Sequence, residues 1–466
     1  MSETSVYKEF KELMGDPEIK GIVRVSNLEP IGGAGSAINP STYPEGKEDK
    51  LPAGPAISRN GVIRYLDSDS GTAKILRQRG DGRPILGDSA IISSVGAEAT
   101  RQENALWNLR DELDLPGIEV VACDDIVLEN VFDECWEKVK KSYGKAASEI
   151  SERGKEELFK QVRVAISPVG VSNWTLAHRH TDGIIRLSKD CGVEGSDKER
   201  HIVATPDSDP NSLYSLIARA TPTSLSDLLL LSPNSVAYGY WLSTNSTFHA
   251  RLARSVASEI TGYGVNRVSY GAVKGAPWEA HKGMYTNDDG ELVIMKASRG
   301  SKRAKDLKKP SEIDVSIALS RKSNYITCQT ILGTTSISVS NLRNVLNTGG
   351  IDPGSIELAI NALVSLPILG TLLNLEDGFL RSGTDLIDTE SYWTAVKRGS
   401  TEKISIPINA KEFFPIAKMV IEEAQNAGVL GTKRRKVEMS ERLAKIFVSS
   451  YIESFLSAGS DEKESD

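Results

Sequence analysis

Residues 238–264 read YGYWLSTNSTFHARLARSVASEITGYG and join an aromatic cluster to a basic segment. Rings stack on unpaired bases and arginines hold phosphates, so this mixture is typical of proteins that bind single-stranded nucleic acid. The same residues also fit a buried aromatic core beside a solvated helix face. The apolar positions Leu252, Val256 and Ile260 are spaced for a helix, which would carry Arg251 and Ser258 on neighbouring faces.

Length and composition allow a large folded core. The chain has 466 residues, of which 39% are hydrophobic, enough for one elaborated domain or up to about three modules. Its four cysteines form no CxxC pair, so neither a zinc site nor a disulfide framework is predicted, and a reducing cytoplasm is the simplest location. The start, MSETSVYKEF, lacks the basic and apolar regions of a signal peptide.

The net charge of -7 argues against nucleic-acid binding, because phosphates attract lysine and arginine. The charges are unevenly distributed, however. Residues 251–309 hold about twelve basic and six acidic residues, whereas the tail 461–466 is mostly acidic. A net acidic protein can therefore still carry a basic groove.

The most apolar stretch, residues 359–373, is shorter than the roughly 20 residues that a membrane span needs. It contains Asn361 and is interrupted by Pro367 and Gly370. These features predict a buried helix that ends at Leu366, and no membrane partner.

Other segments follow from periodicity and turn residues. Residues 30–55 are rich in glycine and proline and predict a long loop or an inserted arm. Residues 60–87 predict an exposed hairpin around RGDGRP, whose arginines fit a solvated turn slightly better than an RNA contact. Helices are predicted at 6–14, 93–106, 130–163, 213–220, 355–366 and twice within 410–457, and strands at 21–28, 118–122, 313–319, 325–332 and 335–339.

Six short elements, in the same order along the chain, resemble a known family. They include Tyr238-Gly-x-Trp241 with Arg254, a Gly-rich turn followed by PSTYP, SSVGAEATRQENAL at 93–106, LAHRHTDGIIRL at 176–187 and Leu380-Arg-Ser. The pattern resembles the backbone subunit of type I-G (formerly I-U) CRISPR effector complexes, a branch of the Cas-seven family. The chain departs from the family pattern at Ser41, at Gly96, Glu98 and Thr100, and at residues 268–271, where an SRIDP-like element is missing.

The resemblance implies an α+β fold: an RNA-recognition-motif-like (ferredoxin-like) antiparallel sheet palm with helical insertions and an extended thumb-like arm. The palm would span residues 1–400, with the arm at about 30–85, a helical insertion at about 130–163 and a basic loop at about 283–309. Residues 401–466 would form a C-terminal helical region with an acidic tail.

The resemblance also implies a function. Copies of the chain would oligomerise along a guide (CRISPR) RNA and present it for pairing with target DNA in antiviral defence. The partners would be the guide RNA, the target DNA, further copies of the chain, other effector subunits and a recruited helicase-nuclease. No cofactor is implied.

The predicted RNA contacts are the cationic, aromatic and polar residues of the matched elements and of the basic loop. They are Arg101, His178, Arg179, Arg186, Tyr240, Trp241, Arg251, Arg254, Ser258, Lys302, Arg303 and Arg381. Internal alternatives remain open for several of them. Arg101 could pair with Glu98 or Glu103, and Arg381 could close a local ion pair. His178 and His180 are too few to predict a metal site, so none is expected.

Enzymatic activity is not predicted. The chain has no nucleophile elbow, no HExxH helix and no phosphate-binding loop, since GVLGTK at 428–433 lacks the order GK[ST]. Two other functions remain open: an RNA-processing ribonuclease, and a structural filament protein without nucleic acid.

Overall fold

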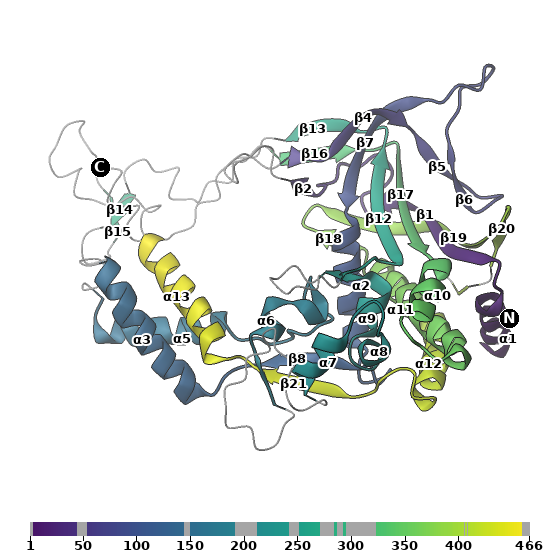
Figure 1. Cartoon of the computed structure of the whole chain (residues 1–466). Helices are drawn as coiled ribbons and strands as arrows, with labels where there is room; N and C mark the ends of the chain where they lie inside the picture. The colour runs from purple at the N-terminus through teal and green to yellow at the C-terminus, as the bar shows by residue number, and fades with distance from the viewer. Residues whose placement is uncertain are drawn as a thin grey trace.

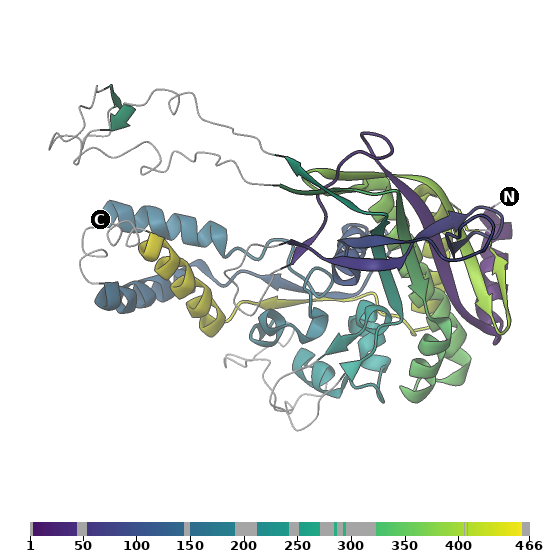
Figure 2. The same cartoon turned by 90° about the horizontal axis from the view of Figure 1, so that it is seen from above.

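The fold combines one large curled antiparallel sheet with helices against one of its faces. A separate group of three helices lies to one side of this body (Figure 1, Figure 2). The expected mixture of α and β structure is confirmed. The computed structural model describes residues 3–43, 54–143, 150–191, 212–241, 251–270, 284–286, 292–294, 323–404, 406–407 and 409–458.

The central sheet has eight strands, in the order β18-β19-β1-β17-β12-β7-β4, with β20 paired to β19. All of these pairings are antiparallel. Threonine, isoleucine and valine are frequent in the inner strands, as expected because β-branched side chains pack well on a pleated surface. The strands are β1 (Ile19–Pro30), β4 (Ile57–Val62), β7 (Leu86–Ser93), β12 (Val256–Tyr263), β17 (Thr330–Ile337), β18 (Phe379–Arg381), β19 (Thr384–Lys397) and β20 (Ser400–Lys403).

Strand β12 corrects the helix predicted at residues 252–260. Its burial alternates over Val256–Tyr263, with Ser258 buried between Val256 and Ile260. A spacing of four residues between apolar positions fits a helix, but it is also two periods of a strand. The intervening serine is buried as well, so the true period is two.

Helices cover the sheet face that carries most of the core. They are α1 (Glu3–Gly15), α2 (Val95–Asn108), α10 (Val339–Thr348), α11 (Ile356–Asp377) and α12 (Ala410–Asn426). Their buried side chains form one cluster that includes Phe10, Leu106, Leu363 and Phe413. The predicted helices at 6–14 and 93–106 are confirmed.

Helix α11 runs through Pro367 and ends at Asp377, where Gly378 forms a left-handed cap, so the predicted end at Leu366 was wrong. An interior proline costs about 3 kcal/mol because a backbone hydrogen bond is lost. Burial of the helix on all sides outweighs this cost, since its residues from Ala359 to Leu372 are buried.

By length and composition alone, residues Pro353–Asp377 could also cross a membrane. However, 78% of the most apolar window is already buried inside the protein. The segment is therefore the central helix of the core.

The three separate helices have a core of their own. Helices α3 (Asp125–Tyr143), α5 (Glu152–Ala165) and α13 (Glu441–Ala458) bury Phe132, Trp136, Leu158, Val448 and Ile452 together. The C-terminal region is thus divided between two cores, because α12 packs on α11 and α13 packs on α3. We call these three helices the helical module.

A small sheet connects the helical module to the larger body. It contains β8 (Gly117–Val121), β21 (Arg434–Glu438) and β9 (Lys189–Asp190) in the order β8-β21-β9. The basic run at 433–436, expected between two helices, thus lies largely in a strand. Arg434 pairs with Asp111, and Arg435 pairs with Asp190 at 2.7 Å. These arginines hold the small sheet in place.

The remaining strands form arms. Strands β5 (Arg64–Asp67) and β6 (Thr72–Ile75) make a hairpin over β17 and β1, and β13 (Asn266–Tyr270) pairs with β16 (Ser323–Thr327). The expected long loop after β1 contains the short strands β2 (Thr42–Tyr43) and β3 (Gly54–Pro55). The basic loop at 283–309 falls largely outside the described residues, which retain only β14 (Met284–Thr286) and β15 (Leu292–Ile294). The strand predicted at 313–319 also lies outside them.

Candidate nucleic-acid interface

A short hairpin presents an aromatic ring beside an arginine. Strands β10 (Tyr240–Trp241) and β11 (Arg251–Leu252) pair so that Trp241 lies opposite Arg251 and Tyr240 lies opposite Leu252. Directly opposite residues project from the same face of a hairpin. Trp241 is 61% exposed and Arg251 is exposed, whereas Tyr240 and Leu252 are buried. The hairpin therefore has an inner face in the core and an outer face that carries Trp241 and Arg251.

Tyr240 anchors the inner face. Its hydroxyl donates to the carbonyl oxygen of Ala220 at 3.2 Å, and its ring meets the His180 ring edge-on at 4.7 Å between centroids. Burial raises the pKa of Tyr240 to about 12. The prediction of Tyr240 as an RNA contact is corrected, because its ring is occupied by internal packing.

Two residues of one short 3₁₀ turn hold the backbone on either side of Tyr240. This turn, η1 (Arg179–Thr181), follows exposed His178. Arg179 Nη1 donates to the carbonyl of Gly239 at 2.9 Å, and Thr181 Oγ1 donates to the carbonyl of Trp241 at 3.3 Å. The chain between these carbonyls is thereby fixed, with the Trp241 ring outward.

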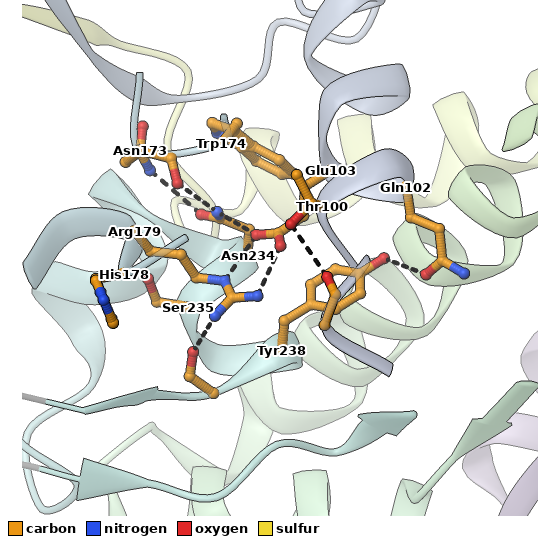
Figure 3. Close-up of polar contacts among 12 residues, drawn as sticks. Thr100, Gln102, Glu103, Asn173, Trp174, His178, Arg179, Asn234, Ser235 and Tyr238 are labelled. Atoms are coloured by element: carbon orange, nitrogen blue, oxygen red, sulfur yellow. Dashed lines mark hydrogen bonds and ion pairs between the residues drawn. The ribbon is translucent and has the colours of Figure 1, made fainter. Parts of the chain in front are cut away.

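Arg179 is fixed in turn by a buried ion pair with Glu103 of α2 (Figure 3). Its Nε and Nη2 donate to the two carboxylate oxygens at 2.7 and 2.6 Å, a bidentate geometry. The side chains of Arg179 and Glu103 are only 11% and 4% exposed. Arg179 also has a φ of 54°, a left-handed backbone that disfavours arginine. The prediction of Arg179 as an RNA contact is corrected, because its guanidinium is occupied internally.

Buried amides complete the surroundings of Glu103. Asn234 Nδ2 donates to Glu103 Oε1 at 2.8 Å and to the carbonyl of Asn173 at 2.9 Å (Figure 3). Asn173 Nδ2 donates to Ser232 Oγ at 2.7 Å. Burial raises the pKa of Glu103, while Arg179 and Asn234 oppose that rise by stabilising the carboxylate. The network joins α2 to the segments that precede the hairpin.

The two histidines of the turn lie in different surroundings. His178 is exposed at the start of η1, as a nucleic-acid contact requires. His180 is buried, with Nδ1 2.7 Å from Ser235 Oγ, and burial lowers its pKa to about 3. Nowhere in the described part of the chain do three His, Cys, Asp or Glu side chains gather as a metal site.

Ser258 lies in a buried polar row that joins α2, β12 and β17. Its hydroxyl accepts from Gln102 Nε2 at 2.9 Å and donates to Thr335 Oγ1 at 3.0 Å. Gln102 Oε1 accepts in turn from the hydroxyl of Tyr238 at 3.1 Å. The prediction of Ser258 as an RNA contact is corrected, because strand pairing places it inside.

Arg101 and Arg381 form a second cationic site near the start of α2. Arg101 pairs with Glu98, one of the two internal partners considered for it. Arg381 does not close the local ion pair considered for it but donates to neutral oxygens, the carbonyl of Ile92 at 2.8 Å and Ser41 Oγ at 2.8 Å. Burial lowers the pKa of Arg381, and repulsion from Arg101 lowers it further. Both side chains are partly exposed, so each keeps a surface toward solvent.

The other predicted contacts differ in exposure. Arg251 and Arg254 are exposed, and no residue in the described ranges forms a hydrogen bond or ion pair with either side chain. Arg186, in the short helix α6 (Gly183–Arg186), is half-buried, and burial lowers its pKa. Lys302 and Arg303 lie outside the described residues.

Sequence reasoning did not identify the supporting residues Asn173 and Asn234. Both lie in short polar stretches, SNW and SPNS, next to apolar residues. A buried amide beside tryptophan or proline is a weak signal in one sequence, and the partners are 61 residues apart. Glu103 was considered only as a partner for Arg101.

Comparison with known proteins identifies the family. The sequence model of CRISPR-associated protein GSU0053 matches residues 22–267, which is more than half of the chain and includes α2, η1 and the hairpin. No curated protein sequence matches. A chain of a solved structure described as "CRISPR RNA-guided surveillance complex, pre-nicking" is 8% identical, with a TM-score of 0.29, and covers 92% of this chain and 100% of its own. That TM-score is too low to support any conclusion. On the strength of the family match, the chain belongs to the CRISPR-associated protein GSU0053 family.

Proposed function

We propose that the chain is a backbone subunit of the Cas-seven type in a Cascade-type effector complex of subtype I-G. Copies of the chain oligomerise along the guide RNA and leave its bases free to pair with target DNA. The outward pair of Trp241 and Arg251 carries this proposal most directly. A ring for base stacking beside a cation for phosphate is the surface that single-stranded RNA requires.

The neighbouring residues support the same surface. His178 is exposed at the turn that holds the hairpin, and Arg254 is exposed three residues after Arg251. Arg101, Arg186 and Arg381 are partly exposed and serve as secondary contacts. Cations of this kind hold the guide by its backbone, so base pairing supplies the sequence specificity.

The order of the central strands supports an RNA-recognition-motif-like palm. In the sheet, β19, β1, β17 and β12 are neighbours in that order. Helix α2 lies between β1 and β12 in the sequence, and α11 lies between β17 and β19. Two β-α-β units with this interleaved strand order make the ferredoxin-like arrangement. The other strands extend this core at both edges.

The other partners are further copies of the chain, other effector subunits and a recruited helicase-nuclease that cuts the DNA. Identical copies joined head to tail form an open helix along the RNA, because the contact is heterologous. The chain itself acts as a scaffold in the cytoplasm, without catalysis and without a cofactor.

The decisive experiment is to purify the chain with its co-expressed genomic neighbours and to sequence the bound nucleic acid. Uniform small RNAs with CRISPR repeat ends are the expected result. Heterogeneous host RNA would reduce the proposal to general RNA binding. A filament without nucleic acid would favour a structural protein, and cleavage of repeat RNA by the chain alone would favour a ribonuclease.

A further inference from the structure

A second basic element lies far along the chain from the Trp241 hairpin. Residues 77–84, RQRGDGRP, form a tight hairpin between β6 and β7 that projects from the upper corner of the sheet in Figure 1. We call it the arginine-rich hairpin. The Gln78 amide donates to the carbonyl of Arg83 at 2.8 Å, and Arg77 Nη1 donates to the carbonyl of Gly82 at 2.8 Å. The reversal needs Gly80 and Gly82, whose φ angles are 108° and 69°.

The base of the arginine-rich hairpin is fixed to the sheet. The Leu76 amide donates to the carbonyl of Ile63 at 2.8 Å, and the Ile85 amide donates to the carbonyl of Leu76 at 2.9 Å. Leu76 and Ile85 pack against a small cluster formed by Ile63, Tyr263 and Leu332. The hairpin therefore projects from an anchored base with a defined backbone.

Its charge is opposite in sign to that of the whole chain. The eight residues include three arginines, Arg77, Arg79 and Arg83, and only one acid, Asp81. All eight residues are exposed. Arg83 Nε lies 3.3 Å from Asp81 Oδ2, and the two side chains are 81% and 48% exposed. An exposed pair of this kind contributes little stability. No described residue pairs with the side chain of Arg79.

The residue type indicates the ligand. A turn whose only requirement is to be soluble could equally well carry lysine, glutamate or serine. Its backbone would not need to be ordered. Three guanidinium groups on a fixed backbone instead suit the oxygens of phosphate, which arginine binds with two parallel hydrogen bonds. Because the backbone is already ordered, binding costs little backbone conformational entropy, and the entropy loss is confined to the arginine side chains.

We propose that the arginine-rich hairpin binds the phosphodiester backbone of a nucleic-acid strand. The inference rests on the proposed function, because the strand comes from the same RNA-guided complex. The guide RNA and the target DNA offer the same phosphate chemistry, and the experiment distinguishes them. The hairpin thus adds a further phosphate contact to those proposed for Arg251 and Arg254.

The test uses the complex purified with its co-expressed neighbours. The triple variant R77Q/R79Q/R83Q removes three charges from the hairpin. The matched control K8Q/K20Q/R398Q also removes three exposed charges, one from α1, one from the start of β1 and one from the residue after β19. Fluorescence anisotropy measures the binding of labelled guide RNA to the RNA-free chain, and of labelled complementary DNA to the guide-loaded complex, at salt concentrations from about 0.05 to about 0.3 M.

Each phosphate contact to a single strand contributes about 0.7 to the slope of log affinity against log salt. Three lost contacts should therefore reduce the slope by about 2 and weaken binding on the order of 10- to 100-fold at about 0.1 M salt. A loss in the RNA arm assigns the hairpin to the guide, and a loss only in the DNA arm assigns it to the target strand.

Equal affinities and slopes for the triple variant and the control would overturn the inference while leaving the proposed function intact. If the wild-type chain binds no RNA and carries none from the cell, the proposed function fails and this inference fails with it. The thermal midpoint of the triple variant should equal that of the wild type, because its changed side chains are exposed.

Discussion

Replacing Arg179 by methionine should destabilise the protein strongly, because Glu103 would remain as a buried carboxylate without a cation. The wild-type guanidinium makes two hydrogen bonds to Glu103 at 2.6 and 2.7 Å and one to the Gly239 carbonyl at 2.9 Å. Breaking a buried pair by removing one partner costs about 3–5 kcal/mol. The double variant E103Q/R179M removes both charges and should recover part of this loss.

The same variant should depend on pH in a defined direction. Burial raises the pKa of Glu103, and without Arg179 the main opposing effect disappears. The folded variant then holds a proton that the unfolded chain releases near the ordinary pKa of 4.5. Its stability should therefore be highest at acidic pH and fall as the pH rises toward the raised folded pKa of Glu103.

The assay is guanidinium unfolding followed by circular dichroism at about pH 5 and pH 8. The matched control is R163M, which breaks an exposed pair with Asp125 whose side chains are 57% and 67% exposed. That control should lose no more than about 1 kcal/mol at either pH. If R179M lost no more than R163M, or showed no dependence on pH, the reasoning about the buried pair would be refuted.

Three other predictions concern the hairpin and the core. W241A should weaken RNA binding by about 1–3 kcal/mol, measured by anisotropy, without lowering the thermal midpoint, because the lost ring is an exposed stacking surface. G239A should destabilise the fold and loosen the Trp241 hairpin, because the φ angle of Gly239 is 79° and an added Cβ would lie 2.7 Å from both Arg254 N and Leu252 O. An unchanged free energy of unfolding together with an unchanged RNA affinity would contradict this prediction. F413A should cost about 3–5 kcal/mol in denaturant unfolding, because the Phe413 ring is fully buried and packs edge-on against Phe10; a loss below about 1 kcal/mol would show that the core is loosely packed there.

Local patterns allowed many elements to be predicted from the sequence. Helix α2 begins where Ser94 accepts a hydrogen bond from the Ala97 amide, and serine at such a position is a readable start signal. Strand β1 covers the strand predicted at 21–28, whereas β17 takes in parts of the two strands predicted at 325–332 and 335–339. Such signals are local, because they depend only on residues a few positions apart.

The errors in the candidate site have a different cause. An arginine that contacts RNA and an arginine that pairs with a buried acid look the same in one sequence. Arg179 meets Glu103 across 76 residues and Ser258 meets Gln102 across 156, so neither pair is visible from spacing. Trp241 and Tyr240 are adjacent in sequence, yet a strand sends one ring outward and the other into the core.

The net charge of -7 does not by itself argue against the RNA binding that we propose. Several acids of the described chain are used inside the fold, where Glu98, Glu103 and Asp388 pair with Arg101, Arg179 and Arg24. Such pairs are nearly neutral at a distance and do not repel a phosphate strongly. The electrostatic potential near the Trp241 hairpin therefore depends mainly on exposed cations such as Arg251 and Arg254. The net charge of the whole chain is a poor guide to this local potential. Raising the salt concentration should accordingly weaken RNA binding, as it does for cation and phosphate contacts in general.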